Sequence, residues 1–263
     1  MIEVKNLVKR FGDKVVINDV SSVMKAGQCN LIIGTSGSGK TVFMKCMVGL
    51  LEPNAGEIFF EGKSFTHMSQ EERKEIRTEI GMLFQGSALF DSLTVEDNVM
   101  FPLNMFTKWT YQKKRARVNE VLDRVNLTGS NKKFPAEISG GMKKRVGIAR
   151  AIVLNPKYLF CDEPNSGLDP QTSILIDQLI QEITLEYSIT TVINTHDMNS
   201  VMEIGNQILY LYQGNKEWEG NKKEIIFSKN QLLNDFIFAS EFLKDAKEMR
   251  MIEEAAKLAK DKK

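Results

Sequence analysis

With 263 residues, of which 42% are hydrophobic, the chain can form one large domain or two small ones around a sizeable core. Its 35 basic and 34 acidic residues nearly cancel, so we expect no nucleic acid as the main partner. Cys29, Cys46 and Cys161 form no CxxC pair, and we interpret them as reduced structural thiols rather than metal ligands. The chain opens with an amphipathic strand pattern instead of a signal peptide, and no apolar run approaches the ~20 residues that cross a bilayer.

Short apolar runs alternate with helical patterns along the chain. From the N-terminus, the expected strands are 30–34, 56–60, 80–85, 157–163 and 190–197. The expected helices are about 40–50, 69–77 with a capping box of Ser69 and Glu72, and 170–187 with Pro170 near its start. Residues 86–155 are mostly helical and interrupt this rhythm. The alternation predicts an α/β fold with a parallel sheet, whose functional groups belong at the carboxyl ends of the strands.

The C-terminal part of the chain has a separate pattern, which turns helical from about Lys229. Apolar residues recur there every three or four positions and form one stripe on a charged helix. The residues of this stripe are Ala239, Phe242, Ala246, Met249, Ile252, Ala256 and Ala259. The pattern fits a helix packed on its own domain, a clasp between two subunits, and a docking helix for a partner, and these three alternatives stay open.

The strand at 30–34 runs into GTSGSGKT, which fits G-x-x-x-x-G-K-[ST] without a mismatch and opens a helix, as this motif requires. Glycines let backbone N–H groups turn toward phosphate oxygens, and the helix N-terminus adds its dipole. Lys40 is placed to reach the β- and γ-phosphates, and the Thr41 hydroxyl to bind Mg²⁺. The predicted phosphate-binding residues are Gly34, Thr35, Ser36, Gly37, Ser38, Gly39, Lys40 and Thr41.

Polar side chains also stand at the ends of three other apolar strands. Asp162 ends YLFCD, where it can hold Mg²⁺ through water, and the next residue, Glu163, can polarise an attacking water. Gln85 ends IGMLFQ, and its amide can bind Mg²⁺ or orient water. His196 ends TTVINTH, and this position favours a functional role for it. His67 lies in a polar loop, and we assign it no role.

A further anion site is predicted from EISGGMKKRVGIARAI at 137–152. Ser139, Gly140 and Gly141 come directly before a strong helix pattern, and residues 143–145 place positive charge in its first turns. Cations there oppose the positive end of the helix dipole, so the charge needs a reason. A helix start that binds an anion supplies one.

The chain resembles the nucleotide-binding subunits of ATP-binding-cassette (ABC) transporters. The features that carry this resemblance are the phosphate loop, Gln85, ISGGM at 138–142, CDEP at 161–164, SGLD at 166–169 and His196. The resemblance covers about residues 1–228. It implies an α/β P-loop NTPase (RecA-like) core with a mostly parallel sheet, an N-terminal antiparallel β subdomain, a helical signature subdomain and a C-terminal helical tail. The implied divisions are 1–85 for the β subdomain and the first part of the core, 86–155 for the helical subdomain, 156–228 for the rest of the core, and 229–263 for the amphipathic extension.

The resemblance also implies that a homodimer sandwiches two ATP molecules between its subunits, which hydrolyse them to ADP and phosphate. Ser139, Gly140 and Gly141 of one subunit would bind the γ-phosphate of the ATP held by the other. Asp169, in SGLD, would lie on the dimer seam and link the two sites. Phe11 would stack on adenine, at a position where Tyr is commoner.

A narrower resemblance points to one branch of this family. Thr35, Asn165 and Met142 stand where Pro, Thr and Gln are common. The SGGM form and the segment FQGSALFDSLTVEDNVMFPL at 84–103 are similar to the Mla/Mce ATPases, which drive phospholipid or lipid movement across the bacterial envelope. This implies an integral membrane permease as partner, a lipid-binding Mce-type protein and a small regulatory subunit as further partners, and a place on the cytoplasmic face of the inner membrane. The apolar residues between Phe84 and Phe106 could face the permease or the core.

Other functions stay open beside this one. The chain could be the ABC ATPase of another importer or exporter. A soluble cassette protein acting on ribosomes or DNA usually has two cassettes or a long coiled coil, whereas this chain has one cassette and balanced charge. A regulatory ATP-binding module without catalysis would not need Lys40, Asp162, Glu163 and His196 together. Co-purification with a permease and measured ATP turnover would separate these alternatives.

Overall fold

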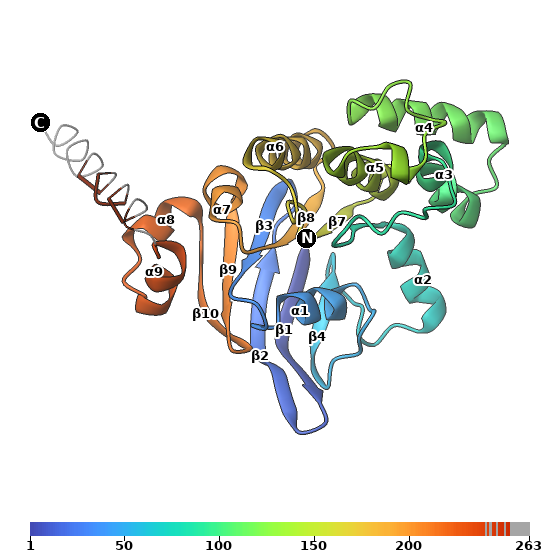
Figure 1. The fold of residues 1–263 in the computed structure, drawn as a ribbon. Helices are drawn as coiled ribbons and strands as arrows, with labels where there is room; N and C mark the ends of the chain where they lie inside the picture. The colour runs from blue at the N-terminus through green and yellow to red at the C-terminus, as the bar shows by residue number, and fades with distance from the viewer. Residues whose placement is uncertain (240, 242–243, 246, 250, 253–263) are drawn as a thin grey trace, which may run out of the picture.

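The computed structural model describes residues 1–239, 241, 244–245, 247–249 and 251–252 (Figure 1). A four-stranded and a six-stranded sheet form the centre of this part of the chain. Among the described residues, no helix is both long enough and apolar enough to cross a membrane.

The four-stranded sheet is antiparallel and lies at the N-terminal end of the chain. It consists of β1 (Ile2–Phe11), β2 (Lys14–Met24), β4 (Ala55–Phe60) and β5 (Lys63–Ser64), in the order β2-β1-β4-β5. In β1, Ile2 and Val4 are buried and Lys5 is exposed, as expected for a strand with one covered face. The N-terminal strand pattern and the strand expected at 56–60 are confirmed here, and so is the antiparallel β subdomain.

The six-stranded sheet is mostly parallel. It consists of β3 (Gln28–Ile33), β6 (Ile80–Leu83), β7 (Tyr158–Asp162), β8 (Thr190–Thr195), β9 (Gln207–Tyr212) and β10 (Asn215–Gly220), in the order β10-β9-β3-β8-β7-β6. Its strands pair in parallel except for β10, which pairs antiparallel with β9. The remaining four expected strands are confirmed within a few residues as β3, β6, β7 and β8. The sequence pattern gives no expectation for β9 and β10.

Buried apolar side chains form two clusters, one on each face of the parallel sheet. Ile32 of β3 belongs to the cluster that includes the antiparallel sheet and α1 (Lys40–Met47). Leu31 and Ile33 belong to the cluster on the other face, which includes residues of several helices. Since successive side chains of a strand point to opposite faces, one short strand supports both clusters. Full burial of each such side chain stabilises the fold by about 1.5–3 kcal/mol.

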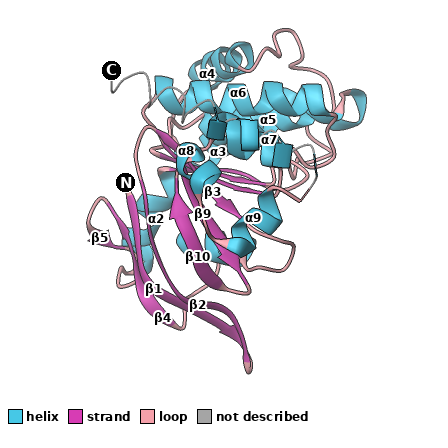
Figure 2. Ribbon diagram, turned by 90° about the vertical axis from the view of Figure 1, so that its left-hand side faces the viewer, coloured by secondary structure: helices cyan, strands magenta, loops and turns pink. Residues whose placement is uncertain are grey.

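The helices of residues 86–155 pack on one another, and Figure 1 shows them grouped at one side of the molecule. They are α3 (Val95–Phe106), α4 (Tyr111–Arg124), the 3₁₀ turn η1 (Pro135–Glu137) and α5 (Gly140–Ile152). The helix α2 (Gln70–Thr78) precedes them, and α6 (Pro170–Glu186) and α7 (Met198–Ile204) follow. Figure 2 shows α3 to α7 together on one side of the parallel strands. The expected helical character of 86–155 is confirmed, with irregular segments before Val95 and between α4 and α5.

Two helices begin where the sequence predicts. Ser69 accepts a hydrogen bond from the Glu72 backbone N–H, and the Glu72 carboxylate accepts one from the Ser69 N–H, which confirms the capping box of α2. At α6, Asp169 is the N-cap and Pro170 lies in the first turn. These caps fix where the helices begin and hence where the preceding loops end.

The C-terminal part continues with α8 (Lys222–Phe227) and α9 (Gln231–Ile237). Leu233 and Ile237 of α9 are buried in the core cluster that also contains Leu31 and Ile33 of β3. Of the predicted apolar stripe, Met249 and Ile252 are 65% and 70% exposed, and Ala239 is exposed. The stripe residues Phe242, Ala246, Ala256 and Ala259 lie outside the described residues.

The three cysteines are free and buried, in agreement with the expected structural thiols. Burial raises the pKa of Cys29 and of Cys46 to about 11. Burial raises the pKa of Cys161 as well. All three thiols are therefore held in the neutral form at physiological pH.

Candidate active site

Four loops meet at the carboxyl edge of the parallel sheet, where they follow β3, β6, β7 and β8. A cavity of about 590 Å³ opens between them. Its lining residues are Val16, Thr35, Ser36, Gly37, Gly39, Lys40, Thr41, Val42, Gln85, Glu163, His196 and Phe236. Most of these are residues that the sequence predicts, and they come from segments far apart in the chain.

The phosphate loop joins β3 to α1 and presents polar groups to this cavity. Lys40 Nζ donates to the carbonyl oxygens of Gly34 at 2.8 Å and Thr35 at 3.0 Å. Gly34 has φ 150°, and a Cβ there would lie 2.3 Å from the Leu211 carbonyl oxygen, so only glycine fits. The Ser38 hydroxyl is buried and has no partner among the described residues. A loop of backbone amides, a lysine and an unpaired buried hydroxyl suits phosphate oxygens.

Burial lowers the pKa of Lys40, whereas the nearby carboxylates of Glu163 and Asp162 act in the opposite direction. An ammonium group with little water around it gains more from binding phosphate oxygens than an exposed one does, because the local dielectric constant is low.

Oxygen donors suited to Mg²⁺ gather beside the loop. Thr41 Oγ1 lies 3.2 Å from Asp162 Oδ1, which also accepts from Asn194 Nδ2 at 3.0 Å. The Gln85 amide lines the same cavity. No group of three or more His, Cys, Asp and Glu side chains among the described residues could hold a metal by itself. The donor set instead fits an ion that one carboxylate holds together with a hydroxyl, waters and substrate phosphates, as Mg²⁺ is commonly bound.

Glu163 and His196 meet at the rim of the cavity. His196 Nδ1 lies 2.7 Å from Glu163 Oε2, and their side chains are 65% and 14% exposed. Glu163 adopts φ 50°, a left-handed conformation that is rare for a non-glycine residue. Its backbone N–H donates to Asn194 O at 3.0 Å, and its carbonyl oxygen accepts from Lys144 Nζ at 3.2 Å. The strained loop therefore aims a carboxylate at the space above the phosphate loop.

The segment SGGM lies at the N-terminus of α5 and does not line this cavity. Ser139 is the N-cap and accepts from the Met142 N–H, and Ser139 and Gly140 are exposed. The sequence suggests that the charge of Lys144 and Arg145 serves an anion at the helix start. Instead, Lys144 donates to the backbone carbonyl of Glu163, and Arg145 donates to that of Val125. Their charged groups therefore hold the backbone of the neighbouring loops.

Two other predicted residues lie away from the cavity lining. Asp169 caps α6, with its carboxylate accepting from the Thr172 N–H at 2.9 Å and the Thr172 hydroxyl at 2.5 Å, and these bonds lower its pKa. Phe11, at the end of β1, is 48% exposed, and the Lys9 ammonium lies 5.0 Å from its ring centroid. Both side chains are exposed and therefore accessible to a bound molecule or a second chain.

The sequence matches the model of one protein family, described as ABC transporter, over residues 17–166. The chain belongs to the ABC transporter family. As an ATP-binding cassette of this family it is an ATPase that binds and hydrolyses ATP to power transport.

Relatives of this ABC ATPase include transport proteins with different named cargo. It is 41% identical over 236 residues to "Probable ribonucleotide transport ATP-binding protein mkl" of Mycobacterium leprae, covering 90% of this chain and 68% of that one. It is 38% identical over 259 residues to "Methionine import ATP-binding protein MetN" of Campylobacter jejuni, covering 92% and 77%. The chain thus spans about two thirds of the length of the mkl protein.

Solved structures show the same fold for this ABC ATPase. The dimeric post-hydrolysis state of the ATP-binding cassette MJ0796 bound to ADP and Pi superposes with a TM-score of 0.77 at 31% identity. The match covers 84% of this chain and 99% of that one. Cassettes of this family therefore form dimers that hold nucleotide.

Phe236 of α9 lines the ATPase cavity, although no sequence motif predicts it. Its ring stacks on Tyr210 of β9, with the centroids 5.3 Å apart and the planes 22° from parallel. The Tyr210 hydroxyl in turn lies 3.3 Å from Leu232 O, which ties α9 to the sheet. Because the residue belongs to a helix far along the chain, only the three-dimensional arrangement identifies it.

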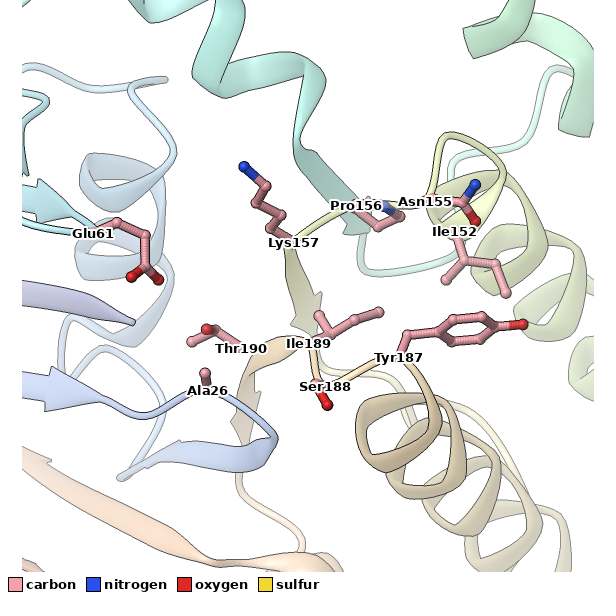
Figure 3. Close-up of a pocket in the computed structure, with 10 residues that line it drawn as sticks. All are labelled: Ala26, Glu61, Ile152, Asn155, Pro156, Lys157, Tyr187, Ser188, Ile189 and Thr190. Carbon is pink, nitrogen blue, oxygen red and sulfur yellow. The ribbon is translucent and has the colours of Figure 1, made fainter.

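A second cavity, of about 300 Å³, lies at the opposite edge of the parallel sheet, where β7 and β8 begin (Figure 3). None of its lining residues is a predicted site residue. Of its charged residues, Lys157 forms an ion pair with Glu79 at 2.7 Å. This cavity is separate from the ATPase site and has no comparable set of functional groups.

Proposed function

We propose that this ABC ATPase uses Glu163 as the general base of hydrolysis, with His196 holding the carboxylate and the γ-phosphate in line. The 2.7 Å contact between the two side chains at the rim of the phosphate-loop cavity carries this proposal. A carboxylate there can accept a proton from water as it attacks the γ-phosphate. His196, with a second ring nitrogen free of that contact, can donate to a phosphate oxygen.

The phosphate loop binds the triphosphate through its backbone amides, and Lys40 places positive charge on the β- and γ-phosphates. The Ser38 hydroxyl, which is buried without a partner among the described residues, supplies a further donor. Thr41, Asp162 and Gln85 would hold Mg²⁺, which would supply positive charge to neutralise the phosphates. Phe11 stacks on the adenine ring at the outer end of the site.

Each site is completed by a second copy of the chain. Ser139, Gly140 and Gly141 lie outside the cavity of their own subunit, yet they form a helix start that suits an anion. In a head-to-tail homodimer they bind the γ-phosphate of the partner's ATP, and Asp169 lies on the seam. The fold shared with a dimeric cassette bound to ADP and Pi supports this arrangement.

The helical subdomain transmits the closure of this dimer to an integral membrane permease. In α3, Val95, Val99 and Leu103 are buried in the core, so this part of the apolar stretch is structural. Apolar side chains around it stay 39–61% exposed, namely Phe84, Phe90, Met105 and Phe106. Such a patch suits an apolar partner surface. Binding there places the chain on the cytoplasmic face of the inner membrane.

The cargo of the complex is a phospholipid or another lipid. Support comes from the SGGM form and from residues 84–103, which resemble the Mla/Mce branch. A lipid-binding Mce-type protein and a small regulatory subunit complete this assembly. Import of a small solute is the second candidate, because the relatives include MetN, whose name specifies methionine, and a protein named for spermidine and putrescine.

The catalytic proposal is tested by Glu163→Gln, which keeps the shape of the side chain but removes the proton acceptor. ATP turnover should fall about 10²–10⁴-fold while ATP still binds, because the phosphate loop is unchanged. Glu71→Gln, an exposed acid on α2 outside the cavity, is the matched control and should keep its turnover. Near-normal hydrolysis by the Glu163→Gln protein would remove Glu163 from its role.

The cargo proposal is tested on the chain purified together with its membrane partner and reconstituted in vesicles. ATP-dependent transfer of a fluorescent phospholipid between vesicles should occur, and Glu163→Gln should abolish it. Uptake of labelled methionine or spermidine into the same vesicles, without phospholipid transfer, would favour the second candidate and overturn the lipid proposal.

A further inference from the structure

Three buried polar side chains from three different elements meet beneath the catalytic loops. Asn165 lies in the loop after β7, Asp177 on α6 and Ser200 on α7. Asn165 Nδ2 donates to Ser200 Oγ at 3.0 Å, and Ser200 Oγ donates to Asp177 Oδ2 at 2.7 Å. Asn165, Asp177 and Ser200 are 9%, 3% and 0% exposed. We call these residues the buried triad.

Two members of the buried triad lie close in sequence to an active-site side chain, and the third lies on the helix that follows SGLD. Asn165 follows Glu163 by two residues, in a loop that has left-handed φ at Glu163. Ser200 lies in the first turn of α7, which begins directly after His196 and Asp197. Asp177 lies on α6, which is capped by Asp169. The hydrogen bonds therefore connect the Glu163 loop, the His196 loop and the helix that follows SGLD.

The buried triad does not maximise stability. Asn165 Oδ1 and Asp177 Oδ1 are buried without a hydrogen-bond partner among the described residues. Burial raises the pKa of Asp177 to about 6. Hydrogen bonding to Ser200 and Asn165 lowers the pKa, whereas the nearby charges of Asp197 and Glu203 raise it further. Apolar side chains of similar size would avoid both costs. A polar cluster that destabilises its surroundings points to a role other than packing.

The contact between Glu163 and His196 needs other residues to hold it in place. The His196 side chain is 65% exposed, so its own burial does not fix its direction. Glu163 depends on a loop with strained backbone. A displacement of about 1 Å between reacting groups can lower a rate about 10²-fold. Whatever holds the two loops at a fixed separation therefore contributes to the rate.

We propose that Asn165, Ser200 and Asp177 are positioning residues that hold the loops of Glu163 and His196 in register for ATP hydrolysis. This inference rests on the catalytic roles proposed above for those two residues. An ionised Asp177 only accepts hydrogen bonds, so the Ser200 hydroxyl must donate to it and keeps its lone pairs for Asn165 Nδ2. The carboxylate thus sets the direction of the whole chain of hydrogen bonds, which an amide at position 177 would not do.

The test compares Asp177→Asn and Ser200→Ala with a matched change on α6. Thr184→Val removes another buried hydroxyl of this helix, which bonds Thr191 Oγ1 at 2.6 Å near the opposite edge of the sheet. We expect Asp177→Asn and Ser200→Ala each to lower kcat about 3–10-fold, with the Kd for ATP changed less than about twofold, because the phosphate loop is untouched. Thr184→Val should leave kcat unchanged even if it lowers the Tm.

The double variant of Asp177→Asn and Ser200→Ala should lose little more than either single variant, because both changes interrupt one chain of hydrogen bonds. Unchanged kcat in both single variants, with Glu163→Gln inactive, would overturn the positioning role alone. Active Glu163→Gln would instead overturn the proposed function. Equal losses of kcat and ATP affinity would indicate a general structural defect and also overturn the inference. If Ser200→Ala does not fold, the nearly isosteric Asp177→Asn decides the result.

Discussion

Replacing Asp177 by Asn should make the protein more stable at neutral and alkaline pH while making it slower. Asp177 is 3% exposed, and burial raises its pKa from the ordinary 3.8 to about 6. Above that pH the folded protein carries a buried charge, whereas Asn carries none. The gain in stability should therefore depend on pH, whereas a gain that came from better packing would be the same at every pH.

The size of the effect follows from the shift in pKa. Between pH 3.8 and about 6, the folded chain holds a proton on Asp177 that the unfolded chain has lost. The free energy of unfolding of the wild type therefore falls as pH rises through this window and stays low above it. The penalty is about 1 kcal/mol at pH 4.5 and about 3 kcal/mol at pH 8, at about 1.4 kcal/mol per pKa unit. The advantage of Asp177→Asn should thus grow by about 2 kcal/mol between the two pH values.

The assay is thermal unfolding of both proteins at pH 4.5 and pH 8. For a chain of this size about 1 kcal/mol shifts the Tm by roughly 2 °C, so the difference in Tm should widen by about 4 °C at pH 8. Asp123→Asn, which removes an exposed carboxylate, controls for the loss of one charge. The same difference in Tm at both pH values, or a destabilised variant at pH 8, would refute the argument that Asp177 is a costly buried charge.

Three further predictions concern the dimer, the nucleotide and the C-terminal part. Mixing a Ser139→Arg subunit with an inactive Lys40→Ala subunit should restore up to about a quarter of the wild-type ATPase activity, because both changes fall in one site of each mixed dimer; no recovery in proven mixed dimers would contradict shared sites. Phe236→Ala should weaken ATP binding a few-fold in a fluorescence titration, because its ring lines the cavity, and unchanged affinity would exclude a contact with nucleotide. Truncation after Ala239 should change the Tm by less than about 2 °C, because it removes no described core residue, and light scattering then shows whether the removed segment holds a dimer together. A large fall in Tm would show instead that this segment covers its own domain.

The sequence predicts the parts of this protein in which short-range pattern and chemistry agree. The phosphate loop between β3 and α1, the capping box of Ser69 and Glu72, and the buried strands β7 and β8 each have a local signal that decides their structure. The sequence also predicts that the loops after the parallel strands lie together, because the carboxyl ends of parallel strands meet at one edge of the sheet.

Other features depend on contacts that no local pattern records. Phe236 reaches the cavity because α9 packs on β9. Asn165 and Ser200 meet only when α7 packs beside the loop after β7. The sequence pattern predicts Lys144 as a surface charge at a helix start, yet its side chain is buried and donates to Glu163 O. In each case a long-range contact decides the role of a residue whose neighbours in sequence suggest another.

The central claim is that ATP closes two copies of this chain around shared sites in which Glu163 activates water. The most direct test measures mass and bound nucleotide together for the Glu163→Gln protein with ATP, by light scattering and labelled ATP. We expect a stable dimer that forms only with ATP and holds two ATP molecules, with almost no release of phosphate. ATP bound by a monomer, or steady phosphate release from the dimer, would contradict it.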